Sequence, residues 1–215
     1  ETYGHISGWD VSNVTEMESL FWGASDFNDD ISSWDVSNVT DMSLIFYSAT
    51  SFNQPLNTWD VSSVENMYGM FLNADSFNQD LSSWDVSSAT YMKFMFRNCD
   101  AFNQDLSNWD VSKVTSMNEM FRSSPNFNTD LSGWDVSSVE DFHAMFYDSN
   151  FNGDVSGWIF KEEGPINMDW MFRGAISNFE GNGLETWDVS KVTSMESMFQ
   201  SWVMNGSVLG TSVLN

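Results

Sequence analysis

The sequence predicts an α/β repeat solenoid of stacked units, and two observations predict it. Tryptophan recurs at intervals of 25 residues five times, then 24 and then 29. A fixed set of apolar residues accompanies each of these tryptophans. A unit of this length cannot bury its apolar face alone, so it stacks on its neighbours. The tryptophans of the series are Trp9, Trp34, Trp59, Trp84, Trp109, Trp134, Trp158 and Trp187.

The residues around each tryptophan predict one short parallel strand per unit. In Leu81-x-x-Trp84-x-Val86, tryptophan and valine stand two residues apart, the period of a strand with one buried face. Asp85 then points to the opposite face. Repeats of about 20 to 29 residues with L-x-x-L-x-L strands are typical of leucine-rich repeats. The expected fold is therefore leucine-rich-repeat-like, with tryptophan in the core at the second leucine position.

The segment after each strand predicts one short helix. Its apolar residues follow helical spacing, as Met42, Ile45, Phe46 and Ala49 do. Thr40 stands before them, where a helix N-cap belongs. The pattern leaves open whether this element is a full α-helix or a single 3₁₀ turn. In either case its methionines and phenylalanines are expected to fill the core.

The repeat runs through the whole chain, so we expect a single solenoid domain of about eight repeats over residues 1–215. The unit at 158–186 is irregular, because Ile159 and Lys161 replace the usual aspartate and serine. The last unit, 187–215, is atypical. An exposed Ile159 on a polar face would be an apolar spot and predicts a contact site, with simple decay of the repeat as the alternative.

The charge of the chain narrows its partners. It carries 31 acidic and 7 basic residues, a formal net charge of −24. Nucleic acid and anionic membrane surfaces need a basic face, so neither is expected as a partner. No stretch of about 18 apolar residues occurs, so we expect no membrane insertion of this segment. Cations, basic proteins and neutral sugars remain.

No catalytic motif is present, and we expect no enzymatic activity. The zinc, P-loop, G-x-S-x-G and H-E-x-x-H patterns are absent from the sequence. His5 and His143 belong to no nucleophile or metal arrangement. Cys99 takes a position where other units have alanine or serine, so it is expected to be a packed core residue. Glycosylation is left open at the sequons of Asn13, Asn38 and Asn205.

The motif W-D-V-S-x-V-T-x-M-x-x-M-F, followed by F-N-x-D-L, resembles the 25-residue repeat of BspA-like surface proteins and mycoplasma-type lipoproteins. The resemblance extends over nearly the whole chain. It implies a leucine-rich-repeat-like solenoid on a secreted or cell-surface protein, with adhesion or protein binding as its role. It supplies no catalytic residues.

The aspartate that follows most of these tryptophans is the main candidate for function. Stacked strands would place equivalent carboxylates about 4.8 Å apart, where like charges repel by about 1 kcal/mol in water. Either each aspartate hydrogen-bonds nearby serines and turn amides, or the carboxylates hold cations or a ligand, and both can hold together. The ligand-binding candidates are Asp10, Asp35, Asp60, Asp85, Asp110 and Asp135, together with Ile159. If Ca²⁺ binds, its candidate ligands are Asp35, Asp60, Asp85 and Asp110, and no other cofactor is expected.

Two further polar series accompany the repeat. One, Asp30, Asp80, Asp105, Asp130 and Asp154, would enlarge the acidic edge. The other is expected to point inward and bond to loop backbone, and consists of Asn28, Asn53, Asn78, Asn103, Asn128 and Asn152.

Together these features predict a non-enzymatic, extracellular or cell-surface repeat protein that binds a protein or glycan on a flat acidic strand face. The alternative is a self-assembling structural unit, a filament or surface layer that stacks end to end. Uncapped solenoid ends favour such homotypic association.

Overall fold

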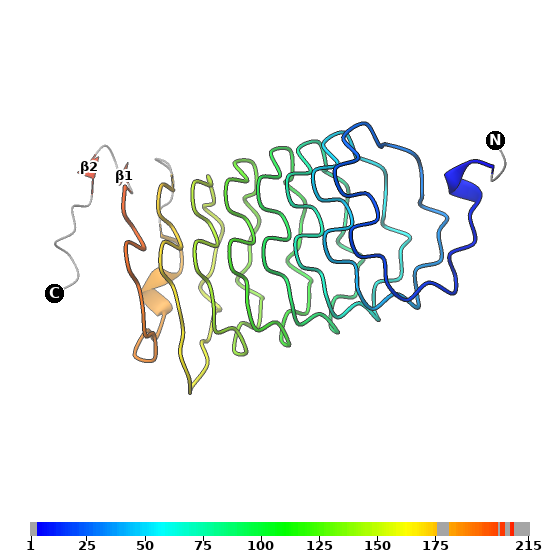
Figure 1. Cartoon of the computed structure of the whole chain (residues 1–215). Coiled ribbons are helices and arrows are strands. Elements are labelled where there is room, and N and C mark those ends of the chain that lie inside the picture. The colour runs from blue at the N-terminus through cyan, green and yellow to red at the C-terminus, as the bar shows by residue number, and fades with distance from the viewer. Residues whose placement is uncertain (1–3, 176–180, 202, 205–206, 209–215) are drawn as a thin grey trace.

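The computed structural model describes residues 4–175, 181–201, 203–204 and 207–208. Within them the chain winds into successive coils that lie side by side from the N-terminal to the C-terminal end (Figure 1). The assigned elements are the 3₁₀ turns η1 (Ile6–Gly8) and η2 (Leu184–Thr186) and the antiparallel pair β1 (Val203–Met204) and β2 (Ser207–Val208). Turns, bends, single bridges and irregular backbone make up the rest. Among these residues no helix has the length and apolar character that a membrane crossing requires.

The predicted α/β unit of one strand and one helix is wrong. In the segment that was expected to be helical, amides alternate between two kinds of acceptor. The amides of Met67, Gly69 and Phe71 donate to carbonyl oxygens of the next coil at 2.8 to 2.9 Å. The intervening amides of Met70 and Leu72 donate to oxygens three residues back in their own coil, at 3.3 and 3.1 Å. The segment is therefore a series of turns that is hydrogen-bonded to the next coil. Thr40, which was expected to cap a helix, precedes turns instead.

The spacing between coils explains why no helix forms. The rings of Phe46, Phe71 and Phe96, one per coil, have centroids 5.5 Å apart. Packed α-helices need about 8 to 10 Å between their axes, so successive coils at this spacing have no room for one each. The backbones instead meet as neighbouring strands do. Single parallel bridges join Glu16, Asp41, Asn66, Tyr91, Ser116, Asp141, Asn167 and Ser194 in order along the stack.

The helix-like pattern arises because these turns repeat every four residues. Phe94 and Asn98 in one coil have φ of 60° and 55°, the left-handed region. A left-handed residue at every fourth position turns Met95, Phe96 and Cys99 inward, at the three-and-four spacing of a helix face. Such a residue costs about 1 to 2 kcal/mol when it is not glycine, and the hydrogen bonds between coils offset this cost.

Around the tryptophans that the structure describes, Trp9 to Trp187, no strand is assigned either. The Trp84 amide donates to the Leu81 oxygen at 3.1 Å, which closes a turn. Its indole Nε1 donates to the Leu56 oxygen of the preceding coil at 2.9 Å. The same indole bond recurs at Trp34, Trp59, Trp109, Trp134, Trp158 and Trp187. Hydrogen bonds from the indoles thus join adjacent coils on this side, where backbone bonds between parallel strands were expected.

The predicted core residues are confirmed from Trp34 to Trp158, whereas Trp9 is exposed and Trp187 is only partly buried. The indoles from Trp34 to Trp158 in the series are only 1 to 4% exposed. Phe96 stacks on Phe102 in its own coil at 4.1 Å and on Phe121 of the next coil at 5.7 Å. The Cys99 thiol is fully buried and donates to the Phe71 oxygen at 2.8 Å, and burial raises its pKa. Cys99 is therefore a packed residue, as expected.

The asparagine series bonds to loop backbone as expected, although its members lie half-buried or exposed rather than inward. The Asn53 side-chain oxygen accepts from the Asn78 amide of the next coil at 2.9 Å. The same bond forms from Asn28, Asn78, Asn103 and Asn128 to the next coil in turn. These amides hold the loops of adjacent coils in register.

Replacing a buried indole by a smaller ring should destabilise the stack. We expect Trp84→Phe to lower the free energy of unfolding by about 2 kcal/mol, since it removes one of the two donors to the Leu56 oxygen, which keeps its bond from the Trp59 amide, and opens a small cavity. The matched control is Trp22→Phe, because Trp22 is 56% exposed and should change stability by no more than about 0.5 kcal/mol. Denaturant unfolding measures both, and equal losses would contradict a special role of the indole bond.

Candidate functional site

The aspartate that follows seven of the eight tryptophans in the series accepts a hydrogen bond within a turn. Asp85 lies outside the core and its Oδ1 accepts from the Ser87 amide at 3.0 Å. The Ser87 hydroxyl and then its amide hold the pKa of Asp85 below its usual range. In the first two coils, Asp10 and Asp35 also accept from the serine hydroxyl, at 2.7 and 2.6 Å. The amide bond recurs at Asp10, Asp35, Asp60, Asp110, Asp135 and Asp188.

The second acidic series has the same role. The Asp80 Oδ1 accepts from the Ser82 amide at 2.9 Å, and the bond recurs at Asp30, Asp105, Asp130 and Asp154. The hydrogen-bonding interpretation of the aspartates is therefore confirmed, while ligand binding by them stays a prediction. In the described part of the chain, no three or more acidic, histidine or cysteine side chains are grouped to hold a metal ion, which includes the candidates Asp35, Asp60, Asp85 and Asp110.

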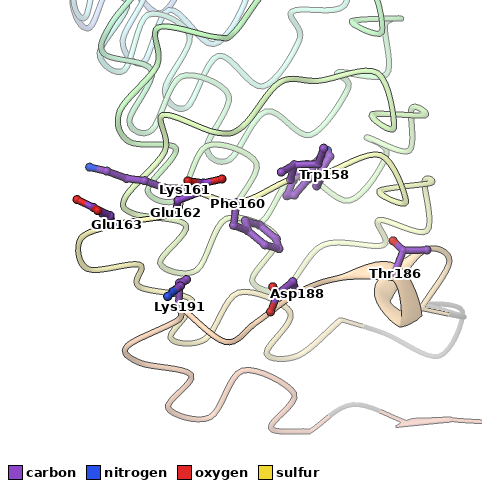
Figure 2. A pocket seen from close by; sticks show the side chains of 9 residues that line it. Trp158, Phe160, Lys161, Glu162, Glu163, Thr186, Asp188 and Lys191 are labelled. Carbon is purple, nitrogen blue, oxygen red and sulfur yellow. The ribbon is translucent and has the colours of Figure 1, made fainter.

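The irregular unit carries the apolar spot that its sequence predicts. Ile159 is 75% exposed. Beside it lies a hollow of about 500 Å³, lined from one coil by Ile159, Lys161 and its neighbours and from the next coil by Asp188 and Lys191 (Figure 2). The neighbouring Phe160 is buried, and its ring packs edge-on against the Trp187 ring of the next coil with centroids 4.9 Å apart. This hollow places Ile159 in a mixed apolar and charged setting.

A second surface lies on the opposite side of the core. The Trp109 and Phe96 rings meet across the core at 6.2 Å, so the backbone segments that bear them lie on opposite sides. Asp110 beside the first and Arg97 beside the second both lie outside the core. The residues flanking the core methionines and phenylalanines form the second surface, here named the arginine–aromatic face: Tyr68, Lys93, Phe94, Arg97, Glu119, Arg122, His143, Tyr147, Trp170 and Arg173.

The arginines of this face connect its coils to one another. Arg97 lies over the Phe94 ring at 5.6 Å and pairs with Glu119 of the next coil at 2.7 Å. Arg122 pairs with the same Glu119 at 3.0 Å and lies over the Tyr147 ring of the following coil at 4.5 Å. Two guanidinium groups thus share one carboxylate, and this shared ion pair joins the two coils.

The network continues into the irregular unit. Arg173 lies over the Tyr147 ring at 5.7 Å and over the Trp170 ring at 4.8 Å. Tyr147 therefore has guanidinium groups from two coils against its ring. At the other end of the face, Lys93 lies 3.9 Å from the Asp141 carboxylate. Four of the seven basic residues of the chain lie on this face, namely Lys93, Arg97, Arg122 and Arg173.

This face was missed from the sequence because the segment was interpreted only as a source of core residues. The signal that finds it is variation between coils. Surface positions beside tryptophan repeat aspartate and serine with few changes, whereas the position after the core phenylalanine changes its chemistry along the stack. That position holds Trp22, Tyr47, Leu72, Arg97, Arg122, Tyr147 and Arg173.

The two interpretations of the aspartates make different predictions at Asp85. If it accepts hydrogen bonds in a turn, Asp85→Asn keeps an acceptor and should leave stability within about 0.5 kcal/mol, whereas Asp85→Ala should lose about 1 kcal/mol. Since the pKa of Asp85 is lowered in the fold, its contribution is present above about pH 3.9 and lost as pH falls below that value. The difference between wild type and Asp85→Ala should therefore shrink in acid.

Thermal unfolding with and without Ca²⁺ completes this test. The turn account expects the ranking of the two variants to be the same in both conditions. A loss of stability in Asp85→Asn that occurs only with Ca²⁺ would show that the carboxylates hold the cation instead.

Comparison with known proteins identifies the family. The family model described as "Mycoplasma protein of unknown function, DUF285" matches residues 1–105, 81–175 and 166–208. No curated protein and no solved structure matches this chain. The mycoplasma part of the expected resemblance is thereby confirmed, and its BspA-like part stays a prediction. Because the matched segments together extend from residue 1 to residue 208, the chain belongs to the DUF285 family of Mycoplasma proteins of unknown function.

Proposed function

We propose that this chain is a non-enzymatic repeat protein of the cell surface or extracellular space that binds a protein through its arginine–aromatic face. The observation that carries the proposal is the continuous network from Tyr68 to Arg173 on one side of the stack. Tryptophan, tyrosine and arginine dominate the energetics of protein interfaces. Membership of a Mycoplasma repeat family is consistent with a surface protein.

The state of the aromatic rings favours a protein over a glycan. A sugar that stacks on an aromatic side chain needs an open ring face. Arg122 and Arg173 lie over the Tyr147 ring, and Arg173 also lies over Trp170, so guanidinium groups occupy these faces. A stacked guanidinium keeps its N–H edge available for carboxylates. A protein that presents carboxylates fits this arrangement better than a neutral sugar.

The acidic face with Ile159 is the second candidate for binding a protein or glycan. The hollow beside the exposed Ile159 is the observation that favours it. Lys161 and Lys191 line that hollow, whereas the arginines of the other face are remote from it. Separate substitutions therefore distinguish the two surfaces.

Binding is tested on one array of purified proteins and one array of glycans. We expect the wild-type chain to bind proteins, and the variant Arg97→Gln/Arg122→Gln/Arg173→Gln to bind them at least tenfold more weakly, because it loses the charged edge of the face. Surface plasmon resonance on the proteins that bind gives the affinities.

The matched control is Lys113→Gln/Lys161→Gln/Lys191→Gln, which removes the same charge from positions outside this face. It should bind as the wild type does. The proposal would be wrong if glycans alone bound, or if the arginine variant bound like the wild type. Weakened binding in the lysine variant alone would favour the hollow beside Ile159.

A further inference from the structure

We infer that the partner of the arginine–aromatic face is a second copy of this chain, which docks through its aspartate face. The aspartate face consists of the residues that follow the core tryptophans, Asp10, Asp35, Asp60, Asp85, Asp110 and Asp135. The inference rests on the proposed function of the arginine–aromatic face and adds the identity of its partner.

The two faces carry complementary charge on opposite sides of one coil. Arg97 and Arg122 share the single carboxylate of Glu119. Among the described residues, no carboxylate oxygen lies within 4.0 Å of the Arg173 guanidinium. Within the described ranges, the three guanidinium groups of this face therefore have one ion-paired carboxylate between them, on a chain whose net charge is −24. Guanidinium groups with this few ion pairs fit an acidic surface, and the same molecule supplies one.

The aspartate face keeps binding capacity after bracing its turns. In Asp35, Asp60 and Asp85 the serine bonds use Oδ1, which leaves Oδ2 outside them. The hydrogen bonds from Ser87 and Ser112 are the main cause of the lowered pKa of Asp85 and Asp110, and the charge of Lys113 on this face adds to it. The coils before Lys113 present carboxylates without such a lysine in the sequence.

Both faces repeat once per coil. The rings repeat at 5.5 to 5.7 Å on the phenylalanine side and at 6.4 Å on the tryptophan side. Arg97 and Arg122 stand in successive coils, so two copies that lie side by side can place these two guanidinium groups against the carboxylates of two successive coils. The partner that fits best is thus another stack of the same repeat.

The distribution of charge along the stack sets the kind of assembly. The cations of the arginine–aromatic face lie between Lys93 and Arg173, whereas the aspartates without a neighbouring lysine lie between Asp10 and Asp60. Docking is therefore offset along the stack. Since the two contacting surfaces differ, each bound copy leaves one face open at either side, so a further copy can add to the assembly.

Salt should affect this association in both directions. Two chains of net charge −24 repel each other when salt is low. At about 0.15 M salt, charges more than about 8 Å apart are screened, whereas groups in contact still attract. Association should therefore be strongest near this concentration and weaker at about 0.01 M and at about 1 M.

Sedimentation velocity of the whole chain from about 1 μM to about 1 mM tests the inference, with concentrations chosen to span weak to moderate affinities. We expect the wild type to form larger species as concentration rises. Arg97→Gln/Arg122→Gln/Arg173→Gln and Asp35→Asn/Asp60→Asn/Asp85→Asn should each remain monomeric, and the asparagines keep the turn acceptors. The control Lys161→Gln/Lys191→Gln, whose lysines belong to neither face, should associate like the wild type, and near-ultraviolet circular dichroism confirms that each variant is folded.

Mixing the two monomeric variants is the decisive step. One keeps an intact aspartate face and the other an intact arginine–aromatic face, so an equimolar mixture should form heterodimers and nothing larger. A wild type that stays monomeric at every concentration and salt would overturn the inference, as would an arginine variant that associates like the wild type, which would indicate contact through the ends. If the wild type is monomeric but its binding to other proteins still depends on these arginines, only the identity of the partner is wrong.

Discussion

Successive coils are held about as closely as paired strands, and the rest of the structure follows from that distance. On the phenylalanine side, alternate amides bond to the next coil. On the tryptophan side, each indole Nε1 reaches a carbonyl of the preceding coil, as Trp84 does at 2.9 Å. The core between them is filled by rings that meet from the two sides, as Phe96 and Trp109 do, so every coil must contribute the same rings at the same places. Repetition of tryptophan and phenylalanine is the direct consequence, and helices are excluded by the same distance.

Much of the core could be predicted from the sequence, whereas the backbone could not. Burial of tryptophan and phenylalanine follows from which positions stay apolar in every unit. The backbone conformation depends on two left-handed residues in each coil, four positions apart. At the first of these two positions, only the coil with Gly69 has a glycine, the residue type that indicates a left-handed conformation. Leu44 and Phe94 adopt positive φ without any such signal. An apolar spacing of three and four therefore fitted a helix equally well.

The prominence of the aspartates in the sequence reflects turn chemistry more than ligand binding. Asp85 repeats because each coil needs the same turn, in which a carboxylate accepts from a serine two residues on. Residues that repeat without change maintain the stack, while residues that change from coil to coil are available for recognition. Arg97, Tyr147 and Arg173 belong to the second kind. Variation between units could have indicated a role for these residues in recognition. Their contacts with one another could not be predicted, because those contacts depend on the distance between coils.

The two faces of each coil differ in their charged groups. One side carries carboxylates bound into turns, and the other carries guanidinium groups stacked on aromatic rings. The central claim is that the second side is the one that becomes covered when the protein engages a partner. Hydroxyl-radical footprinting by mass spectrometry, at dilute and at concentrated protein, measures this directly. Oxidation of Tyr147 and Trp170 should fall as concentration rises, and unchanged oxidation of both while larger species form would contradict the account.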